Sequence, residues 1–95
     1  MKRVEIIINY ALETDLLEAF KEKGVGTKYT AVSNATGRGE SDPKMGDAIW
    51  PQVNSVFMLV CDDREFEILK QVVSDLRKIY PKDGIAMFFS DCEVF

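Results

Sequence analysis

The residues best suited to bind a ligand lie in two short stretches that are rich in glycine and charge. The first begins a polar segment that runs to Pro51, and the second precedes an apolar run near the end of the chain. Backbone N–H groups of such turns can cradle an anion, while an Arg or Lys side chain supplies the opposite charge. The candidate binding residues for a small anionic effector are Gly37, Arg38, Gly39, Lys82, Asp83 and Gly84.

Catalytic and metal chemistry find little support in the sequence. The chain has no His and only two Cys, and these are too far apart in sequence for a C-x-x-C motif, so neither a zinc site nor a Cys-His catalytic pair is indicated. Cys61 and Cys92 lie at the ends of the third and fourth expected strands. In the arrangement described below these strands are about 9 to 10 Å apart, which is too far for a disulfide. We therefore expect buried thiols, no catalytic residues and no metal ligands.

Composition narrows the classes of partner. The formal net charge of −4 and the pI near 4.8 argue against nucleic-acid binding, which depends on clustered Lys and Arg. No apolar run approaches the roughly 20 residues that span a bilayer, and Glu5 interrupts what would be a signal peptide. We therefore expect a cytoplasmic protein without membrane insertion. A length of 95 residues fits a single domain over 1–95.

The elements that must position the candidate site follow from hydrophobic periodicity. The sequence predicts, in order, a strand over Val4–Asn9, a helix over Glu13–Lys23, strands over Thr27–Thr36 and Val53–Cys61, a helix from Asp62 to Ile79 and a strand over Ile85–Phe89. This βαββαβ order is typical of the ferredoxin-like plan, an α+β fold with an antiparallel sheet and two helices on one face.

Local signals mark the ends of the two helices. Thr14 is the expected cap of the first helix, and Gly24 is its natural stop. Asp62 and Glu65 have the spacing of a capping box at the start of the second helix, and Pro81 ends it. The acidic pairs Asp62/Asp63 and Asp91/Glu93 are therefore interpreted as a helix cap and a solvated strand end rather than as catalytic acids.

Two features of this plan bear on function. The strands carry apolar residues on both faces, but two helices can cover only one face, so self-association through the sheet is expected, as an isologous dimer or a closed ring. The end of the second strand and the start of the fourth lie at the same end of the sheet. We therefore expect the 37–51 loop and the Lys82–Gly84 turn to be neighbours. Trp50 is expected to pack against the domain where the loop returns to the third strand, and so to hold the loop rather than a ligand.

Several stretches, taken in order and spacing, resemble the PII-like signal-transduction family, the nitrogen regulatory P-II-like proteins. They are Lys2–Ile8, Lys23–Val25, Thr36–Gly39, Trp50–Val53 and Asp83–Gly84. The resemblance spans nearly the whole chain and marks it as a compact member with a shortened loop after the second strand and without the basic C-terminal segment. It implies a homotrimeric, non-enzymatic regulator that binds ATP, ADP or AMP between subunits and signals to a transporter or enzyme.

Carried over to this chain, the resemblance assigns Gly37 and Arg38 to the base of the loop and Asp83 and Gly84 to the phosphate-side turn. The chain departs from the family where Gly39 replaces a Gln that helps to hold metal and 2-oxoglutarate. Lys82 and Ile85 stand where the family has Gly and Lys, so Lys82 would supply the charge from another position. The loop contains no Tyr, so control by uridylylation does not carry over.

Two other functions remain open from the sequence. An acylphosphatase would need a glycine-rich, Arg-bearing cradle after the first strand, where this chain has Asn9–Leu12. A trimeric metal-tolerance protein of the CutA-like or metal-efflux-associated kind could draw mixed ligands from Asp91–Glu93. Stabilisation by nucleotides, turnover of acyl phosphate and stabilisation by metal alone would distinguish the three.

Overall fold

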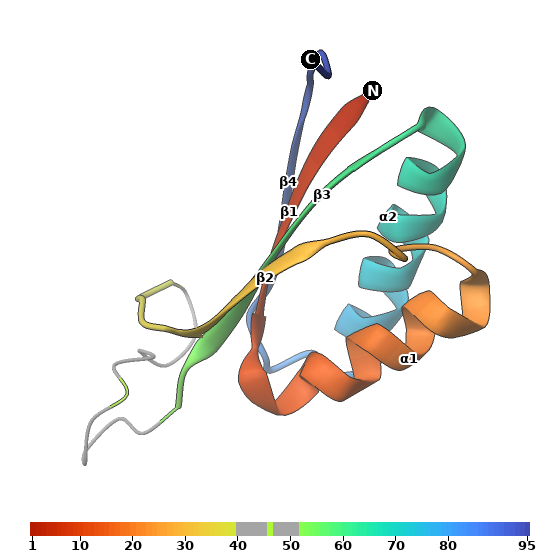
Figure 1. Ribbon diagram of the computed structural model, residues 1–95. Coiled ribbons are helices and arrows are strands. Elements are labelled where there is room, and N and C mark those ends of the chain that lie inside the picture. The colour runs from red at the N-terminus through yellow and green to blue at the C-terminus, as the bar shows by residue number, and fades with distance from the viewer. Residues whose placement is uncertain (40–45, 47–51) are drawn as a thin grey trace.

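The computed structural model describes residues 1–39, 46 and 52–95. Figure 1 shows the elements in chain order. They are β1 (Lys2–Asn9), a 3₁₀ helix (Tyr10–Leu12), α1 (Glu13–Lys23), β2 (Thr30–Ala35), β3 (Asn54–Cys61), α2 (Asp63–Ile79) and β4 (Ile85–Asp91). The predicted βαββαβ order is confirmed.

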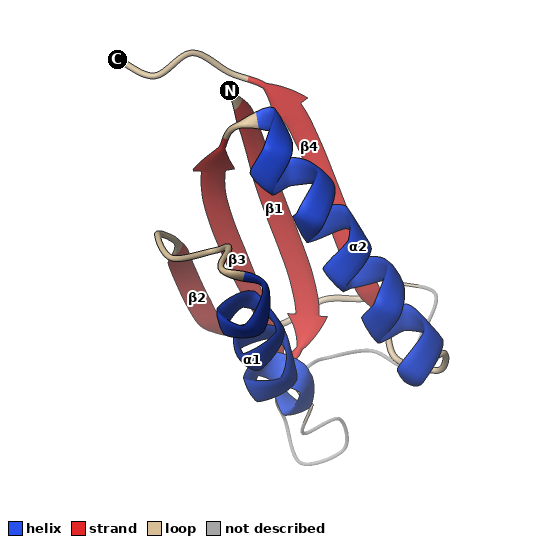
Figure 2. Cartoon of the chain, turned by 90° about the vertical axis from the view of Figure 1, so that its right-hand side faces the viewer, coloured by secondary structure: helices blue, strands red, loops and turns tan. Residues whose placement is uncertain are grey.

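The four strands form one antiparallel sheet in the order β2-β3-β1-β4. Both helices pack on the same face of this sheet, and the opposite face carries no helix among the described residues (Figures 1 and 2). β1 and β3 occupy the two central positions, which suits strands with long apolar runs. We call the face under the helices the covered face and the other the open face.

The hydrophobic core lies between the covered face and the helices. Ile6, Phe57 and Leu69, one residue from each of β1, β3 and α2, are fully buried there. Phe20 of α1 meets Phe57 edge to face, with their ring centroids 6.5 Å apart. Helical spacing predicts a core stripe on α2, and all but one of its residues are buried: Phe66, Leu69, Val72, Val73 and Leu76. Ile79, which the same spacing places in the stripe, is wrong as a core residue, since the helix ends there and 64% of the residue is exposed. Burial of the core side chains is what holds the helices to the sheet.

The first helix begins differently from the prediction. Thr14 is not its cap, because the chain leaves β1 through the 3₁₀ helix, and α1 follows with Leu12 at its N-cap position. The side chain of Asn9 instead accepts a hydrogen bond from the Ala11 N–H at 3.0 Å and caps the 3₁₀ helix. The predicted stop is confirmed, since Gly24 has φ +67° and closes α1 in the left-handed conformation.

The start of the second helix connects two parts of the chain. Asp62 accepts a hydrogen bond from the Glu65 N–H at 2.8 Å, as the capping-box spacing predicts. The Glu65 carboxylate, however, accepts from the Gly26 N–H at 2.7 Å. Gly26 has φ +62°, and a Cβ there would lie 2.3 Å from the ring of Phe20. Glu65 therefore ties α2 to the tight turn after α1.

Two strands differ in length from the prediction. β2 begins at Thr30 rather than Thr27 and has an irregular register between Val32 and Ala35, where Asn34 takes φ +58°. β4 continues past Phe89 to Asp91, because β1 extends beside it to Lys2. The Lys2 ammonium donates a hydrogen bond to the Asp91 carboxylate at 2.5 Å, which raises the pKa of Lys2 and lowers that of Asp91.

Candidate functional site

The two halves of the predicted site lie at the same end of the sheet but on opposite edges. β2, which leads into Gly37, and β4, which follows Gly84, are the two outermost strands. Three strand spacings separate them, or roughly 14 Å. In Figure 1 the chain leaves β2 on the side away from the helices, whereas the turn before β4 lies at the lower end of the sheet, on the side of the helices. The expectation that loop and turn are neighbours is therefore wrong within one chain for the described base of the loop, Gly37–Gly39, because β3 and β1 lie between the two edges.

The turn before β4 forms a hollow of about 430 Å³. The residues that line it are Arg77, Tyr80, Pro81, Lys82, Asp83, Gly84 and Ile85. The guanidinium of Arg77 donates two hydrogen bonds to the Ile85 carbonyl, at 3.1 and 3.0 Å. This fixes a positive charge at the wall of the hollow. Lys82 is exposed and has no ion-pair partner among the described residues, so its ammonium is available to an anion.

The base of the loop presents Gly37, Arg38 and Gly39 with little constraint from the rest of the chain. Gly37 is half-buried, and Arg38 and Gly39 are exposed. Neither glycine has a positive φ, and a Cβ at either position would meet no atom within 4 Å. The fold of a single chain therefore does not require glycine here, in contrast to Gly26.

Most of the predicted loop, including Trp50, lies outside the described residues, which within the loop are 37–39 and 46. The expectations that Trp50 anchors the loop and that the loop contacts a partner therefore remain predictions.

A row of paired residues that includes two Asn crosses this end of the sheet from one edge to the other. Ala35 of β2 pairs with Asn54 of β3, and Asn54 pairs with Asn9 of β1. The Asn9 amide then donates to the Asp83 carboxylate at 3.4 Å. The Asn54 Oδ1 atom is buried, with no donor among the described residues. Sequence reasoning missed this row, although an Asn at the end of each of two apolar strands was visible.

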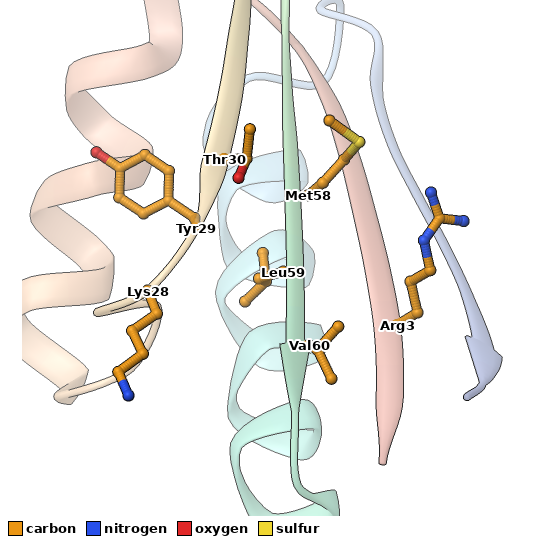
Figure 3. A pocket seen from close by; sticks show the side chains of 7 residues that line it. All are labelled: Arg3, Lys28, Tyr29, Thr30, Met58, Leu59 and Val60. Carbon is orange, nitrogen blue, oxygen red and sulfur yellow. The ribbon is translucent and has the colours of Figure 1, made fainter. Parts of the chain in front are cut away.

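A second hollow, of about 530 Å³, lies alongside β3 at the other end of the sheet. We call it the edge pocket; it is lined by Arg3, Lys28, Tyr29, Thr30, Met58, Leu59 and Val60 (Figure 3). It exists because β2 begins only at Thr30, opposite Met58, so Lys28 and Tyr29 stand away from the last residues of β3. The Tyr29 ring packs on Phe57, with centroids 5.3 Å apart. Sequence reasoning missed this pocket, because the prediction extended β2 back to Thr27.

The two cysteines are both free; Cys61 ends β3 and is buried, whereas Cys92 follows β4 and is only half-buried, so the expectation of buried thiols is confirmed for Cys61 alone. Burial, the largest cause, raises the pKa of the Cys61 thiol, so it is a poor nucleophile. Within the described part of the chain, no three His, Cys, Asp or Glu side chains are grouped so that they could hold a metal ion. Nor is any described helix long and apolar enough to cross a membrane.

Comparison with known proteins places this geometry among solved folds. No protein-family model matches the sequence, and no curated protein matches it. Solved structures do match. CPII, a nitrogen regulatory PII-like protein from Thiomonas intermedia K12, bound to ADP, AMP and bicarbonate, gives a TM-score of 0.74 at 19% identity over 98% of this chain and 86% of that one. This chain has the fold of the PII-like proteins.

Two further structures support the same conclusion. CPII bound to ADP and bicarbonate gives a TM-score of 0.73 at 19% identity, with the same coverage of both chains. A PII-like signaling protein from Thermus thermophilus gives 0.58 at 23% identity, over 94% of this chain and 83% of that one. The resemblance inferred from short motifs is thus confirmed as a structural match over nearly the whole chain.

Proposed function

We propose that this chain is a non-enzymatic PII-like regulator that binds a small anionic effector in clefts between the subunits of a homotrimer. The observation that carries the proposal is the pair of half-sites on opposite edges of one sheet with the PII-like fold. Neither half surrounds a ligand by itself. A ring of subunits would supply the missing half of each site.

The open face supports assembly into such a ring. Near its centre, Ile7, Val56 and Met58 are only half-buried, and Phe88, which Glu5 separates from Met58, is 59% exposed. Val32 and Val60 extend the apolar surface along β2 and β3, with exposed fractions of 49% and 44%. Exposed apolar side chains that gather on one face in this way are commonly covered by another subunit. A closed ring with the open faces turned inward would bury them.

The same ring would complete the effector site. If the β2 edge of one subunit adjoins the β4 edge of the next, Gly37–Gly39 of the first approach the turn Lys82–Gly84 of the second. Unhindered glycine backbone on one side and the charges of Arg38, Lys82 and Arg77 would then surround an anion. Asn54, whose Oδ1 atom is buried, lies in the row that joins the two edges.

An adenine nucleotide is the first effector to test. The CPII structures that share this fold hold ADP, AMP and bicarbonate. ATP, ADP and AMP each combine a polyanion, which suits the cationic turn, with a base that a cleft between subunits can enclose. In this proposal the 37–51 loop carries the state of the site to a regulated protein, a transporter or an enzyme, in the cytoplasm. Because CPII is described as a nitrogen regulatory PII-like protein, nitrogen regulation is the first process to examine.

Calorimetry with ATP, ADP and AMP tests the effector site. Arg38→Ala and Lys82→Ala should each weaken binding by about one to two decades, since each removes a charge-assisted contact worth roughly 1.5 to 3 kcal/mol. Lys23→Ala, at an exposed position of α1, is the matched control and should bind as the wild type does. Both site variants should keep the oligomeric state of the wild type.

Each alternative gives a distinct outcome. Unchanged affinity in both variants would place the effector elsewhere and leave the loop to a protein partner alone. Stabilisation by a divalent metal, with no response to nucleotide, would favour a CutA-like or metal-efflux-associated protein. A wild type that light scattering shows to be a monomer at micromolar concentration would contradict the trimer.

A further inference from the structure

Two opposite charges lie on the open face of β1. Arg3 and Glu5 alternate along the strand with residues that are fully buried on the covered face, so both charged side chains point to the open face. Lys2 and Asp91, the other charged residues of the four strands, pair with each other on the covered side. The strands therefore give the open face one cation and one anion, both from β1.

Glu5 lies between two apolar residues of the same face. It is directly opposite Met58 of β3 on one side and Phe88 of β4 on the other. The Cα atoms of residues paired in this way are about 4.5 to 5.5 Å apart. Arg3 is the next residue along β1 on this face, opposite Val60. Any surface that covers Met58 and Phe88 therefore also covers the Glu5 carboxylate and withdraws it from water.

Neither charge is neutralised within the chain. Among the described residues, Arg3 and Glu5 take part in no ion pair and no side-chain hydrogen bond. In Figure 3 the Arg3 guanidinium lies apart from every other labelled side chain. A charge that is buried without a partner strongly destabilises the contact that buries it. Assembly through the open face therefore requires a cation for Glu5 and an anion for Arg3.

A second copy of the chain supplies both charges. One cation and one anion on the same face make that face complementary to itself, so Arg3 of each copy can meet Glu5 of the next. Rotation about the axis of a ring leaves all copies at the same height. Because the two residues are two positions apart in β1, the pair spans a height difference of at most about 6.7 Å. Arg suits this contact, since its long side chain ends in a fork that binds a carboxylate through two hydrogen bonds.

We propose that Arg3 of one subunit pairs with Glu5 of the next and fixes the register of the open faces in the ring. Each copy gives its Arg3 to one neighbour and receives a guanidinium from the other, so every charge on the face is paired. A different protein bound here would have to bring its own cation and anion at matching positions. The proposal rests on the ring assembly proposed above, but not on any effector.

Sedimentation over a dilution series tests the pair by charge reversal. Arg3→Glu and Glu5→Arg should each raise the concentration at which the assembly half-dissociates by about a hundredfold or more, because like charges then meet in a covered surface. Lys23→Glu and Glu22→Lys make the same changes of net charge on the exposed side of α1 and should leave this midpoint unchanged.

Neutral variants separate the loss of the pair from the burial of a single charge. Glu5→Gln leaves Arg3 covered without a partner and should also raise the midpoint by about a hundredfold. Arg3→Gln/Glu5→Gln leaves no charge unpaired, so its midpoint should stay within about tenfold of the wild type. Far-UV circular dichroism should be the same in all of these variants, since neither side chain belongs to the core.

Mixing the two charge-reversal variants distinguishes a contact between chains from one within a chain. Arg3→Glu leaves only acidic charges on the open face of the sheet, and Glu5→Arg leaves only basic ones. In a mixed ring, two of the three contacts join opposite charges. Native mass spectrometry of the mixture should therefore show trimers that contain both chains, at concentrations where neither variant assembles alone. Each replacement shifts the net charge of −4 by two units, so both variants remain acidic and do not attract each other as whole molecules.

The outcomes separate the two proposals. An assembled wild type whose midpoint ignores both charge reversals overturns the pair and leaves the ring and its effector site standing. Assembly of the one-chain swap Arg3→Glu/Glu5→Arg without mixed trimers also overturns the pair, because the two charges then meet within a chain. A wild type that is monomeric overturns the ring and the pair together.

Discussion

Both faces of the sheet carry apolar residues but differ in burial, and β1 adds the charged Arg3 and Glu5 to the open face. Ile6 and Phe57 on the covered face have no exposed surface, while their sequence neighbours Ile7 and Met58 on the open face keep part of theirs. The difference arises because successive side chains of a strand point to opposite faces and both helices pack on one of them. The covered face therefore stabilises the chain, and the open face is left to stabilise an assembly.

β4 shows the same division between neighbouring residues. Phe89 faces the helices, where its ring meets Phe66 with centroids 4.7 Å apart. Phe88 pairs with Glu5 on the open face and is 59% exposed. The two residues are thus a natural pair for asking which interactions fold the subunit and which join subunits.

The largest expected effect contrasts one residue from each face. Phe57→Asp should abolish folding, because a charge buried in the core costs several kcal/mol against a total stability of about 5 to 15 kcal/mol. Phe88→Asp should leave the far-UV circular dichroism unchanged but abolish the proposed trimer, because the residue reaches no core position. Light scattering and circular dichroism on both variants measure this. A trimeric Phe88→Asp would show that the open face is not the interface.

A smaller effect is expected from the aromatic pair at the margin of the covered face. Phe89→Ala should lower the free energy of unfolding by about 1 to 2 kcal/mol, since half of its surface stays in water and one ring contact is lost. A double-mutant cycle with Phe66→Ala should give a coupling of about 0.5 to 1.5 kcal/mol by urea unfolding. A coupling near zero would mean that Phe89 behaves as an open-face residue.

The smallest effect concerns the hydrogen bond that joins the end of α2 to the start of α1. The Tyr80 hydroxyl donates to the Asp15 carboxylate at 2.5 Å, and this hydrogen bond is the main cause of a raised pKa of Tyr80. A raised pKa means that the contact stabilises the fold below the ordinary value of 10.0 and is lost as the pH rises through the raised pKa.

Melting temperatures between neutral and alkaline pH should therefore fall further in the wild type than in Tyr80→Phe. Tyr10→Phe, at an exposed tyrosine, is the control and should follow the wild type. Parallel curves for the wild type and Tyr80→Phe would show that the hydroxyl contributes nothing to the stability of the helix layer.

Much of the fold could be predicted from local signals in the sequence. The bounds of α1, its stop at Gly24 and the cap of α2 at Asp62 were predicted correctly, because each depends on residues within one or two turns. The cap at the start of α1 was not, since Asn9 acts through an intervening 3₁₀ helix that has no strong pattern of its own. The extra length of β4 depends on its pairing with β1 and is likewise not a local property.

The candidate site was likewise predictable only in those features that depend on local sequence. Composition identified the glycine-rich and cationic stretches at 37–39 and 82–84, and hydrophobic periodicity placed them correctly at one end of the sheet. Their separation on opposite edges depends on strand order, and the Asn9–Asn54 row depends on register. The edge pocket depends on where β2 stops pairing with β3.

The sequence by itself determined which residues prefer strand or helix, where the helices end, and that both faces of the central strands would be apolar. Those properties follow from neighbours along the chain. Only the tertiary structure decided which of two adjacent residues, Phe88 or Phe89, would meet a helix, and which edge would carry each half of the site. These depend on contacts between segments distant in sequence, and a shift of one residue in register would reverse every face assignment.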